Sequence, residues 1–292
     1  MAKGRDIKRR IRSIGSMLQV TKAMELIASI KMKKAQDKAM QSKAYVFESW
    51  RAITRLARLK ENQNNPLLNE RRDGKILCLV ISSDRGLAGS FNGDIMRKTL
   101  KFIEENGVEN IDFITMGSKI KSFIRKVRGN IIADFPLGEN IRFTMTSPIA
   151  LIAWEGYQKE KYKKFVSIHT HFESAARKNA TVLQIMPLDP SILDDSDTKS
   201  ENIISGNSQF RFEPNREIIF STILRHTVRA LTYQVILESE AAEHASRMIA
   251  MKNASDAAGD LKEDFEFTYN QLRQQSITAE LAEISAGAIA QE

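Results

Sequence analysis

The N-terminal part of the chain contains the stretch SMLQVTKAMELIASIKMKKAQDKAMQSKAYVFESWRAITRLARLKENQNN, residues 16–65, which has neither glycine nor proline. These two residues are the commonest interruptions of regular structure, and an average helix runs for only about 11–12 residues. At ~1.5 Å per residue, such a helix would reach roughly 75 Å. After Pro214 there is again no proline, and the only glycines are Gly259 and Gly287. We therefore predict a long helix at each end, over residues 1–62 and 214–292.

Apolar and small residues in the first segment recur at alternating steps of four and three, which is the 3.5-residue repeat of a left-handed coiled coil. The charged Glu25 is a flaw in this pattern or the sign of a shift in register. The seam consists of Ile7, Ile11, Ile14, Leu18, Thr21, Glu25, Ala28, Met32, Ala35, Ala39, Ser42, Val46, Ser49, Ile53 and Leu56. A similar stripe in the second segment consists of Leu224, Val228, Leu231, Val235, Ala242, Ala245 and Ile249, and resumes at Ile277, Leu281, Ile284 and Ala288. Neither stripe is as wide as the face of a globular core helix. We expect the two helices to pair with each other, and to do so antiparallel.

The middle of the chain has a different pattern, in which short apolar runs alternate with helical segments. Five strands are predicted at residues 75–82, 111–116, 131–135, 165–172 and 181–188, with helices at 93–105, 118–127 and 147–160. Alternation of this kind indicates a mostly parallel sheet covered by helices. We therefore predict an α/β fold: a long antiparallel coiled coil of terminal helices with a Rossmann-like α/β domain inserted at residues 75–190. Residues 191–213 are polar and predict a mobile loop.

Composition restricts the class of protein. The net charge of +8 is unevenly distributed: residues 1–60 carry 16 Lys/Arg and 4 Asp/Glu, a net of +12, whereas residues 215–292 carry 7 and 12, a net of −5. The most apolar short run, residues 148–154, is far shorter than the ~20 residues of a membrane-spanning helix. The single cysteine, Cys78, cannot form an internal disulfide and favours a reducing compartment. The basic N-terminus continues the helical pattern, and we interpret it as mature structure.

The sequence offers no convincing catalytic, metal or cofactor site. The loop SDRGLAGSFNG at residues 83–93 follows the first strand, but its spacing fits neither a dinucleotide fingerprint nor a P-loop, and a tight turn explains it better. His169 and His171 share one face of a predicted strand without a third ligand nearby. We predict a non-catalytic protein without a cofactor.

Two other classes of protein stay open at this point. A DNA-binding coiled-coil protein would use the basic first helix on phosphates, although its positive residues lie along the seam and not before it. A nucleotide-dependent enzyme would need ligand binding by the α/β domain. An acidic protein surface is the expected target of the basic helix.

Three motifs resemble one family. The first is VTKAME with SIKM, at residues 20–25 and 29–32, and the second is SDRGLAG followed by FN, at residues 83–89 and 91–92. The third and most specific is EAAEHASRMIAMKNA at residues 240–254, continuing through YN at 269–270, RQ at 273–274 and SITAELAEI at 276–284. Together they resemble the γ subunits of F-type ATP synthases over the whole chain.

The resemblance implies the central stalk, or rotor, of a rotary ATP synthase. Its expected partners are the α and β subunits, the ε subunit and the c-ring, with no nucleic acid. Rotation of the c-ring by proton or sodium flow would turn the stalk and drive the β subunits through different states. Membrane association would be indirect, through the c-ring, at the cytoplasmic face of a bacterial inner membrane.

The resemblance also implies roles for individual residues. Arg273 and Gln274 match positions that grip a loop of one β subunit. The other implied β-coupling positions are Thr278, Glu280, Arg247, Met24, Lys31, Lys33 and Arg85. Phe210 and Phe212 fall where the foot of the stalk approaches the c-ring and the ε subunit.

Overall fold

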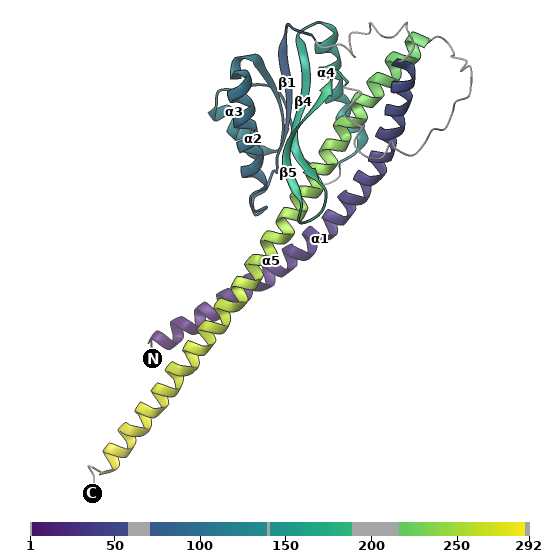
Figure 1. Cartoon of the computed structure of the whole chain (residues 1–292). Coiled ribbons are helices and arrows are strands. Elements are labelled where there is room, and N and C mark those ends of the chain that lie inside the picture. Colours follow the sequence, from purple (N-terminus) through teal and green to yellow (C-terminus); the bar gives the residue numbers. More distant parts are fainter. Residues whose placement is uncertain (1, 58–70, 139–140, 189–215, 290–292) are drawn as a thin grey trace. The chain divides into compact units, whose positions relative to one another are not determined.

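The computed structural model describes residues 2–57, 71–138, 141–188 and 216–289. Its α-helices are α1 (Ala2–Ala57), α2 (Phe91–Asn106), α3 (Ser118–Lys126), α4 (Ser147–Gln158) and α5 (Arg216–Ile289), as labelled in Figure 1. Its strands are β1 (Lys75–Ile81), β2 (Ile111–Met116), β3 (Asn130–Phe135), β4 (Tyr162–Phe172) and β5 (Lys178–Met186). A long helix precedes the α/β sheet along the chain and another follows it, which confirms the predicted fold class. The predicted loop at 191–213 lies outside the described residues.

The chain divides into two compact units, and each is described by itself. The two-helix unit comprises residues 1–30 and 247–292, and the sheet unit comprises residues 31–246. The sheet unit therefore contains the C-terminal part of α1 and the N-terminal part of α5 in addition to the α/β elements.

The sheet has the strand order β3-β2-β1-β4-β5. β1 is parallel to both of its neighbours, with Leu79 level with Ile114 of β2 and Ser167 of β4, and β2 is parallel to β3. Only β5 runs antiparallel, to β4, and it forms one edge of the sheet. This arrangement confirms the prediction of a mostly parallel sheet.

Both faces of the sheet are covered, which explains the continuous apolar run of β1. Alternate side chains of β1 point to opposite faces: Cys78 belongs to a buried cluster with Ile95 of α2, whereas Leu79 belongs to a cluster that includes Trp154 of α4 and Leu237 of α5. Figure 1 shows α2 and α3 on one side of the sheet. Burial of Cys78 raises the pKa of its thiol, so this residue is part of the core.

The predicted seam of α1 matches the burial pattern of this helix. The buried residues among those described in α1 are Thr21, Ala28, Ala35, Ala39, Val46 and Ile53. All six lie on the predicted seam. Most are small, so the seam allows a close approach of the partner helix.

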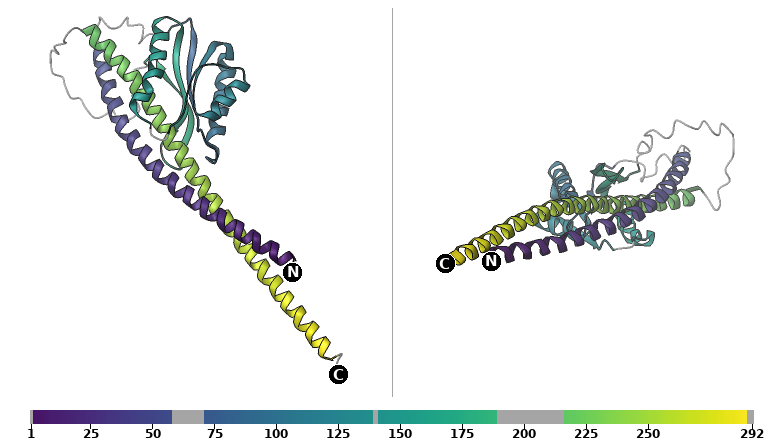
Figure 2. Two further views of the ribbon diagram at one scale, coloured as in Figure 1. Left: turned by 180° about the vertical axis from the view of Figure 1, so that it is seen from behind. Right: turned by 90° about the horizontal axis from the view of Figure 1, so that it is seen from below.

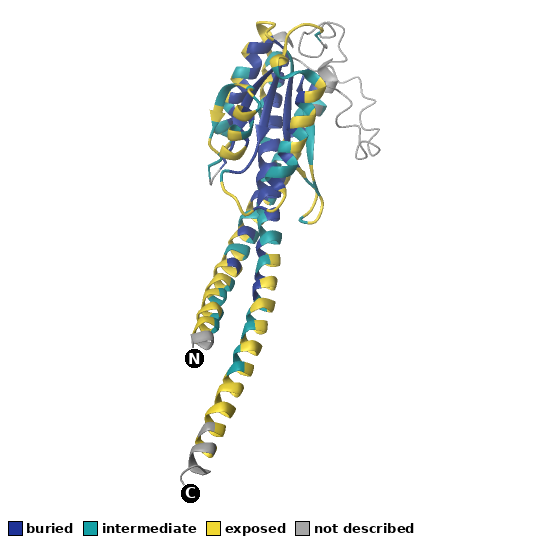
Figure 3. Cartoon of the chain, turned by 90° about the vertical axis from the view of Figure 1, so that its left-hand side faces the viewer, coloured by how far each residue is buried: buried dark blue, intermediate teal, exposed yellow. Residues whose placement is uncertain are grey.

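The prediction for α5 was wrong in one respect. Between Thr227 and Ser246 almost every residue is buried, not only those of the narrow stripe, as the dark blue segment in Figure 3 shows. In the sheet unit this part of α5 belongs to the same core as the sheet, α4 and α1. It serves as a core helix as well as a coiled-coil partner, because a second layer covers the faces that the α1 seam leaves open.

Candidate functional site

In the two-helix unit, α1 and α5 pair in antiparallel register. The Ser255 hydroxyl donates a hydrogen bond to Oγ1 of Thr21 at 2.8 Å, and the Arg10 guanidinium lies 5.8 Å from the centroid of the Phe265 ring. The partner of Arg10 lies later in α5 than the partner of Thr21, so the two helices run antiparallel. The pairing is visible in both views of Figure 2. Small buried residues such as Ala28 and Ala258 complete this contact.

The last turns of α5 extend beyond the start of α1. Continuing the register of Thr21 and Arg10 places Ala2 of α1 level with residues 273–274 of α5, and Figure 1 shows the C-terminal end running past the N-terminal end. The predicted coupling residues of this region are all exposed: Arg273, Gln274, Thr278 and Glu280. A shallow groove of about 470 Å³ along one face of α5 is lined by Gln271, Gln274, Gln275, Thr278, Ala279 and Ala282. The structure therefore brings Gln274 and Thr278 to one surface.

A second apolar stripe on α1 was missed by the sequence reasoning. Five large apolar side chains of the two-helix unit are exposed on α1: Met17, Val20, Leu26, Ile27 and Ile30. Met17, Val20 and Ile27 recur at helical spacing, with the half-buried Met24 between them, off the α1 seam. The sequence did contain this pattern, because these residues recur at steps of three and four next to the residues of the α1 seam. On α5, Ile277, Leu281 and Ile284 are similarly exposed, so the resumed stripe predicted there has no partner within the described chain.

The other predicted coupling residues differ in their surroundings. Arg247 is half-buried on α5 of the two-helix unit. In the sheet unit, Lys31 is half-buried on α1, whereas exposed Lys33 pairs with Asp37 at 3.1 Å one turn later. Arg85 is exposed in the loop after β1. Phe210 and Phe212 lie outside the described residues.

The loop that carries Arg85 is held by its own polar groups. The two carboxylate oxygens of Asp84 accept hydrogen bonds from the backbone N–H groups of Ser118, at 2.8 Å, and Leu137, at 3.1 Å. Asn92 Oδ1 accepts a hydrogen bond from the Ser83 N–H at 3.1 Å. The loop presents Leu87 to solvent in a left-handed conformation, with φ of 63°. Arg85 is thus displayed on a rigid support.

A buried carboxylate lies between α1 and α5 in the sheet unit. Glu240 is 9% exposed, and its Oε2 atom has no hydrogen-bond partner among the described residues. Burial raises the pKa of Glu240 to about 7; Glu243 adds to this increase, whereas Lys38 and Lys31 oppose it. A carboxyl group in such surroundings changes charge near neutral pH.

His171 of β4 is tied to α5 by a short ion pair. Its Nδ1 lies 2.6 Å from Oε2 of Glu238, which also accepts a hydrogen bond at its other oxygen from Gln234 at 2.8 Å. The contact with Glu238 raises the pKa of His171. The hydrogen bonds from His171 and Gln234 hold the pKa of Glu238 below its usual range despite burial. The neighbouring His169 is fully buried, and burial lowers its pKa to about 4. The position of the two histidines on one face was predictable from their spacing, whereas their contact with Glu238 was not.

Replacement of His171 by glutamine is expected to destabilise the chain by up to about 1 kcal/mol at pH 5.5 and by less at pH 9. A histidine whose folded-state pKa is raised contributes its full stability below the unfolded pKa of ~6.5 and loses it as the pH rises through the folded value. The groups that face His171 are Glu238, Glu173, His169 and Lys43. Urea unfolding of both proteins at the two pH values measures the difference, and an equal destabilisation at both would contradict the ion pair.

Within the described parts of the chain, no group of three or more His, Cys, Asp or Glu side chains is arranged to hold a metal ion. No described helix has both the length and the apolar content needed to cross a bilayer.

Two long helices with bare apolar faces and an inserted α/β domain define a subunit of a larger assembly. The family model described as ATP synthase matches residues 3–290. The ATP synthase gamma chain of Heliobacterium modesticaldum is 34% identical over 287 residues, covering 98% of each chain. That of Stenotrophomonas maltophilia is 32% identical over 295 residues, covering 99% of this chain and 100% of the relative. The chain belongs to the family of ATP synthase gamma chains.

Solved structures show the same fold at low sequence identity. A chain of the Euglena gracilis mitochondrial ATP synthase, in a structure of OSCP, F1 and the c-ring, aligns with a TM-score of 0.65 and 16% identity, covering 99% of this chain and 94% of that one. A chain from the central stalk and c-ring of the Tetrahymena thermophila enzyme aligns with a TM-score of 0.60 and 21% identity, covering 81% and 99%.

Proposed function

We propose that this chain is the central rotor stalk of an F-type ATP synthase, a non-catalytic subunit that couples rotation of a c-ring to the conformational cycle of the catalytic β subunits. The family assignment and the shared fold support this role over the DNA-binding alternative. The partners are the α and β subunits, the ε subunit and the c-ring. The ions that drive rotation are protons or sodium ions.

The observation that best supports this function is the exposed apolar surface of the two-helix unit. Val20 and Ile27 on α1 are 57% and 53% exposed, and Leu281 on α5 is 60% exposed. Burying one such side chain fully is worth about 1.5–3 kcal/mol, so a surface of this kind is typical of a protein interface. A sleeve of α and β subunits around the helix pair would cover these side chains while leaving the pair free to turn.

The predicted coupling residues have different roles in the two units. Arg273 and Gln274 grip a loop of one β subunit, and Thr278, Glu280, Arg247 and Met24 add further contacts along the same unit. Lys31, Lys33 and Arg85 of the sheet unit contact an acidic segment of the β subunit. Each orientation of the stalk favours one β conformation through differential contact energy, which is how rotation drives the catalytic cycle.

The proposed domain organisation matches these roles. We assign residues 1–62 and 214–292 to the coiled-coil helices, residues 75–190 to the foot domain, and residues 191–213, which lie outside the described part of the chain, to the segment between them. For Phe210 and Phe212, which lie outside the described residues, we propose contacts with the c-ring or the ε subunit. The chain works at the cytoplasmic face of a bacterial inner membrane, as a peripheral component attached through the c-ring.

The double substitution Val20→Asp/Ile27→Asp is expected to prevent copurification with α and β subunits while leaving the isolated chain folded. Both side chains are exposed, and exposed substitutions change stability by only about 0.5 kcal/mol each. Two carboxylates in a protein sleeve would lose their hydration without a partner, at a cost of several kcal/mol. Affinity purification with α and β subunits of a related bacterial enzyme measures the effect.

The matched control is Leu100→Asp/Leu151→Asp, which places the same two charges at exposed apolar positions of α2 and α4 in the sheet unit. This control should copurify normally. Normal copurification of the Val20→Asp/Ile27→Asp variant would show that the second apolar stripe of α1 is not an interface.

A further inference from the structure

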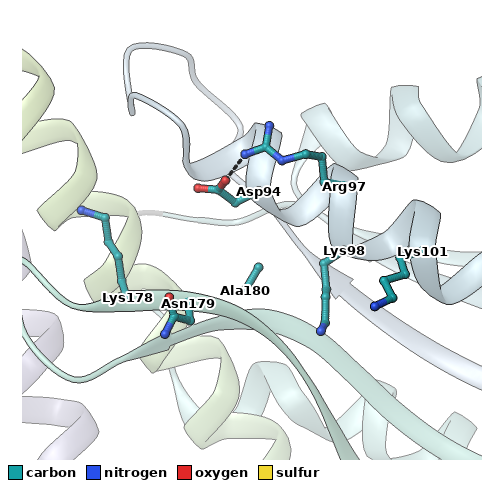
Figure 4. Close-up of a pocket in the computed structure, with 7 residues that line it drawn as sticks. All are labelled: Asp94, Arg97, Lys98, Lys101, Lys178, Asn179 and Ala180. Carbon is teal, nitrogen blue, oxygen red and sulfur yellow. Dashed lines mark hydrogen bonds and ion pairs between the residues drawn. The ribbon is translucent and has the colours of Figure 1, made fainter.

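The sheet unit has a basic pocket between α2 and the edge strand β5. It has a volume of about 480 Å³ and is open to solvent. Figure 4 shows the side chains that line it: Asp94, Arg97, Lys98 and Lys101 of α2, and Lys178, Asn179 and Ala180 of β5. Four of these seven residues are cationic and one is acidic. The family motifs described above do not include any of them.

The positive charges of the basic pocket are only partly neutralised within the chain. Asp94 pairs with Arg97 one turn later on α2. Lys101 lies 3.9 Å from Glu105, with both side chains exposed. In the described part of the chain, Lys98 has no ion pair. The pocket therefore retains an excess of positive charge.

Lys178 is the most constrained of these cations. Its ammonium group donates a hydrogen bond to the Ala175 carbonyl oxygen at 3.3 Å and has no carboxylate at ion-pair distance among the described residues. Partial burial lowers the pKa of Lys178, and the attraction to the more distant Asp94 offsets this effect only in part. An additional anion near this side chain would stabilise its charged form.

The basic pocket lies on the same edge of the sheet as the loop that carries Arg85. The loop leaves the carboxyl end of β1 and leads into α2 at Phe91, so Asp94 and Arg97 lie in its first two turns. β5 begins at Lys178, opposite Phe172 at the carboxyl end of β4. The pocket and Arg85 therefore both lie toward the carboxyl ends of β1 and β4, with the pocket on the side of β5.

We propose that this basic pocket binds a carboxylate-rich segment of another subunit of the assembly, an assignment that rests on the proposed function. Its cations are spread over more than a turn of α2 and onto β5, which matches several separate carboxylates better than one compact phosphate. The one guanidinium, which would suit bidentate phosphate binding, is engaged by Asp94. Complementary charge of this kind speeds association and fixes the orientation of the partner.

The first test uses the full chain and a fluorescently labelled hexaglutamate peptide at low salt. The pocket variant Lys98→Gln/Lys101→Gln/Lys178→Gln should raise the dissociation constant of the peptide about tenfold, because three favourable charge pairs are lost. The control variant Lys119→Gln/Arg125→Gln/Lys126→Gln removes the same charge from α3 and should weaken it by less than about threefold. Circular dichroism of both variants establishes that they are folded.

Parallel measurements with inorganic phosphate and with phosphatidylglycerol vesicles distinguish other anions. We expect neither to discriminate between the two variants. Equal weakening of peptide binding in both variants would overturn the proposal, as would a pocket-specific loss of phosphate or vesicle binding without a loss of peptide binding.

A second test uses the assembled complex and a zero-length carbodiimide cross-linker, which joins a lysine to a carboxylate in direct contact. Cross-links from Lys98, Lys101 or Lys178 to an acidic residue of another subunit are expected. If the chain assembles and stimulates hydrolysis but these lysines form no such cross-link, the pocket assignment fails alone. If the chain does not assemble with α and β subunits, the proposed function fails, whatever the peptide measurement gives.

Discussion

Replacement of Leu237 by alanine should lower the free energy of unfolding by about 2–5 kcal/mol, as for other fully buried leucines. Leu237 is 0% exposed and belongs to the cluster that joins α5 to α1, α4 and the sheet. It does not lie on the narrow stripe predicted from the sequence. Its removal would leave a cavity bounded by several elements, which cannot all move to fill the space. Urea unfolding monitored by circular dichroism gives the value.

The matched control is Leu281→Ala, the same change on the same helix at a side chain that is 60% exposed. Its effect on unfolding should stay within about 0.5 kcal/mol. Similar losses from both substitutions would mean that α5 is not a core helix around Leu237.

Replacement of Glu240 by glutamine should make the chain less sensitive to pH between about 5 and 8. The folded-state pKa of Glu240 is about 7, above its usual value of 4.5. A carboxyl group with a raised pKa favours the folded state while it is protonated, and this contribution is lost as the pH rises through the folded value. At ~1.4 kcal/mol per pKa unit the contribution amounts to about 3 kcal/mol. Glutamine cannot ionise, so the variant should gain stability relative to the original chain as the pH rises.

Unfolding by urea at pH 5 and pH 8 measures this change for both proteins. The side chains that face Glu240 are Lys31 and Lys38 of α1, and Glu243 and Tyr233 of α5. Glu263→Gln, on an exposed position of α5, serves as the control and should leave the pH dependence unchanged. The same shift in both variants would show that Glu240 ionises normally.

The coiled-coil seam of α1 was predictable because packing against one other helix places apolar and small residues at regular intervals in the sequence. A single neighbour selects one residue in every three or four, and Ala28, Ala35 and Val46 follow that rule. The strands were predictable for a related reason: β1 is buried on both faces, so its apolar run is continuous. Cys78 and Leu79 show this, since they enter cores on opposite sides of the sheet.

The extent of burial on α5 could not be read in the same way. Between residues 227 and 246 this helix packs on the α1 seam and within the core of the sheet unit, and small or polar residues outside the predicted stripe, such as Ser239 and Ala241, are buried there. These residues carry little hydrophobic signal, so the sequence pattern shows only the narrower stripe. Which side chains become buried depends on the position of the α/β domain, and no local periodicity encodes that position.

The candidate site was predictable only in part. The motifs around Arg273 and Arg85 indicated positions, and both residues are exposed in the structure. The contact of His171 with Glu238 joins residues 67 positions apart, and the basic pocket joins α2 to β5. Such pairs depend on the register of the fold, which a single sequence does not specify.

The central claim is that this chain turns inside a ring of α and β subunits and couples its rotation to catalysis there. Measurement of ATP hydrolysis after reconstitution with α and β subunits of a related bacterial enzyme tests it most directly. The chain is expected to raise hydrolysis above that of α and β alone, and the Val20→Asp/Ile27→Asp variant is expected not to do so. No gain in hydrolysis with the unmodified, folded chain would contradict the claim.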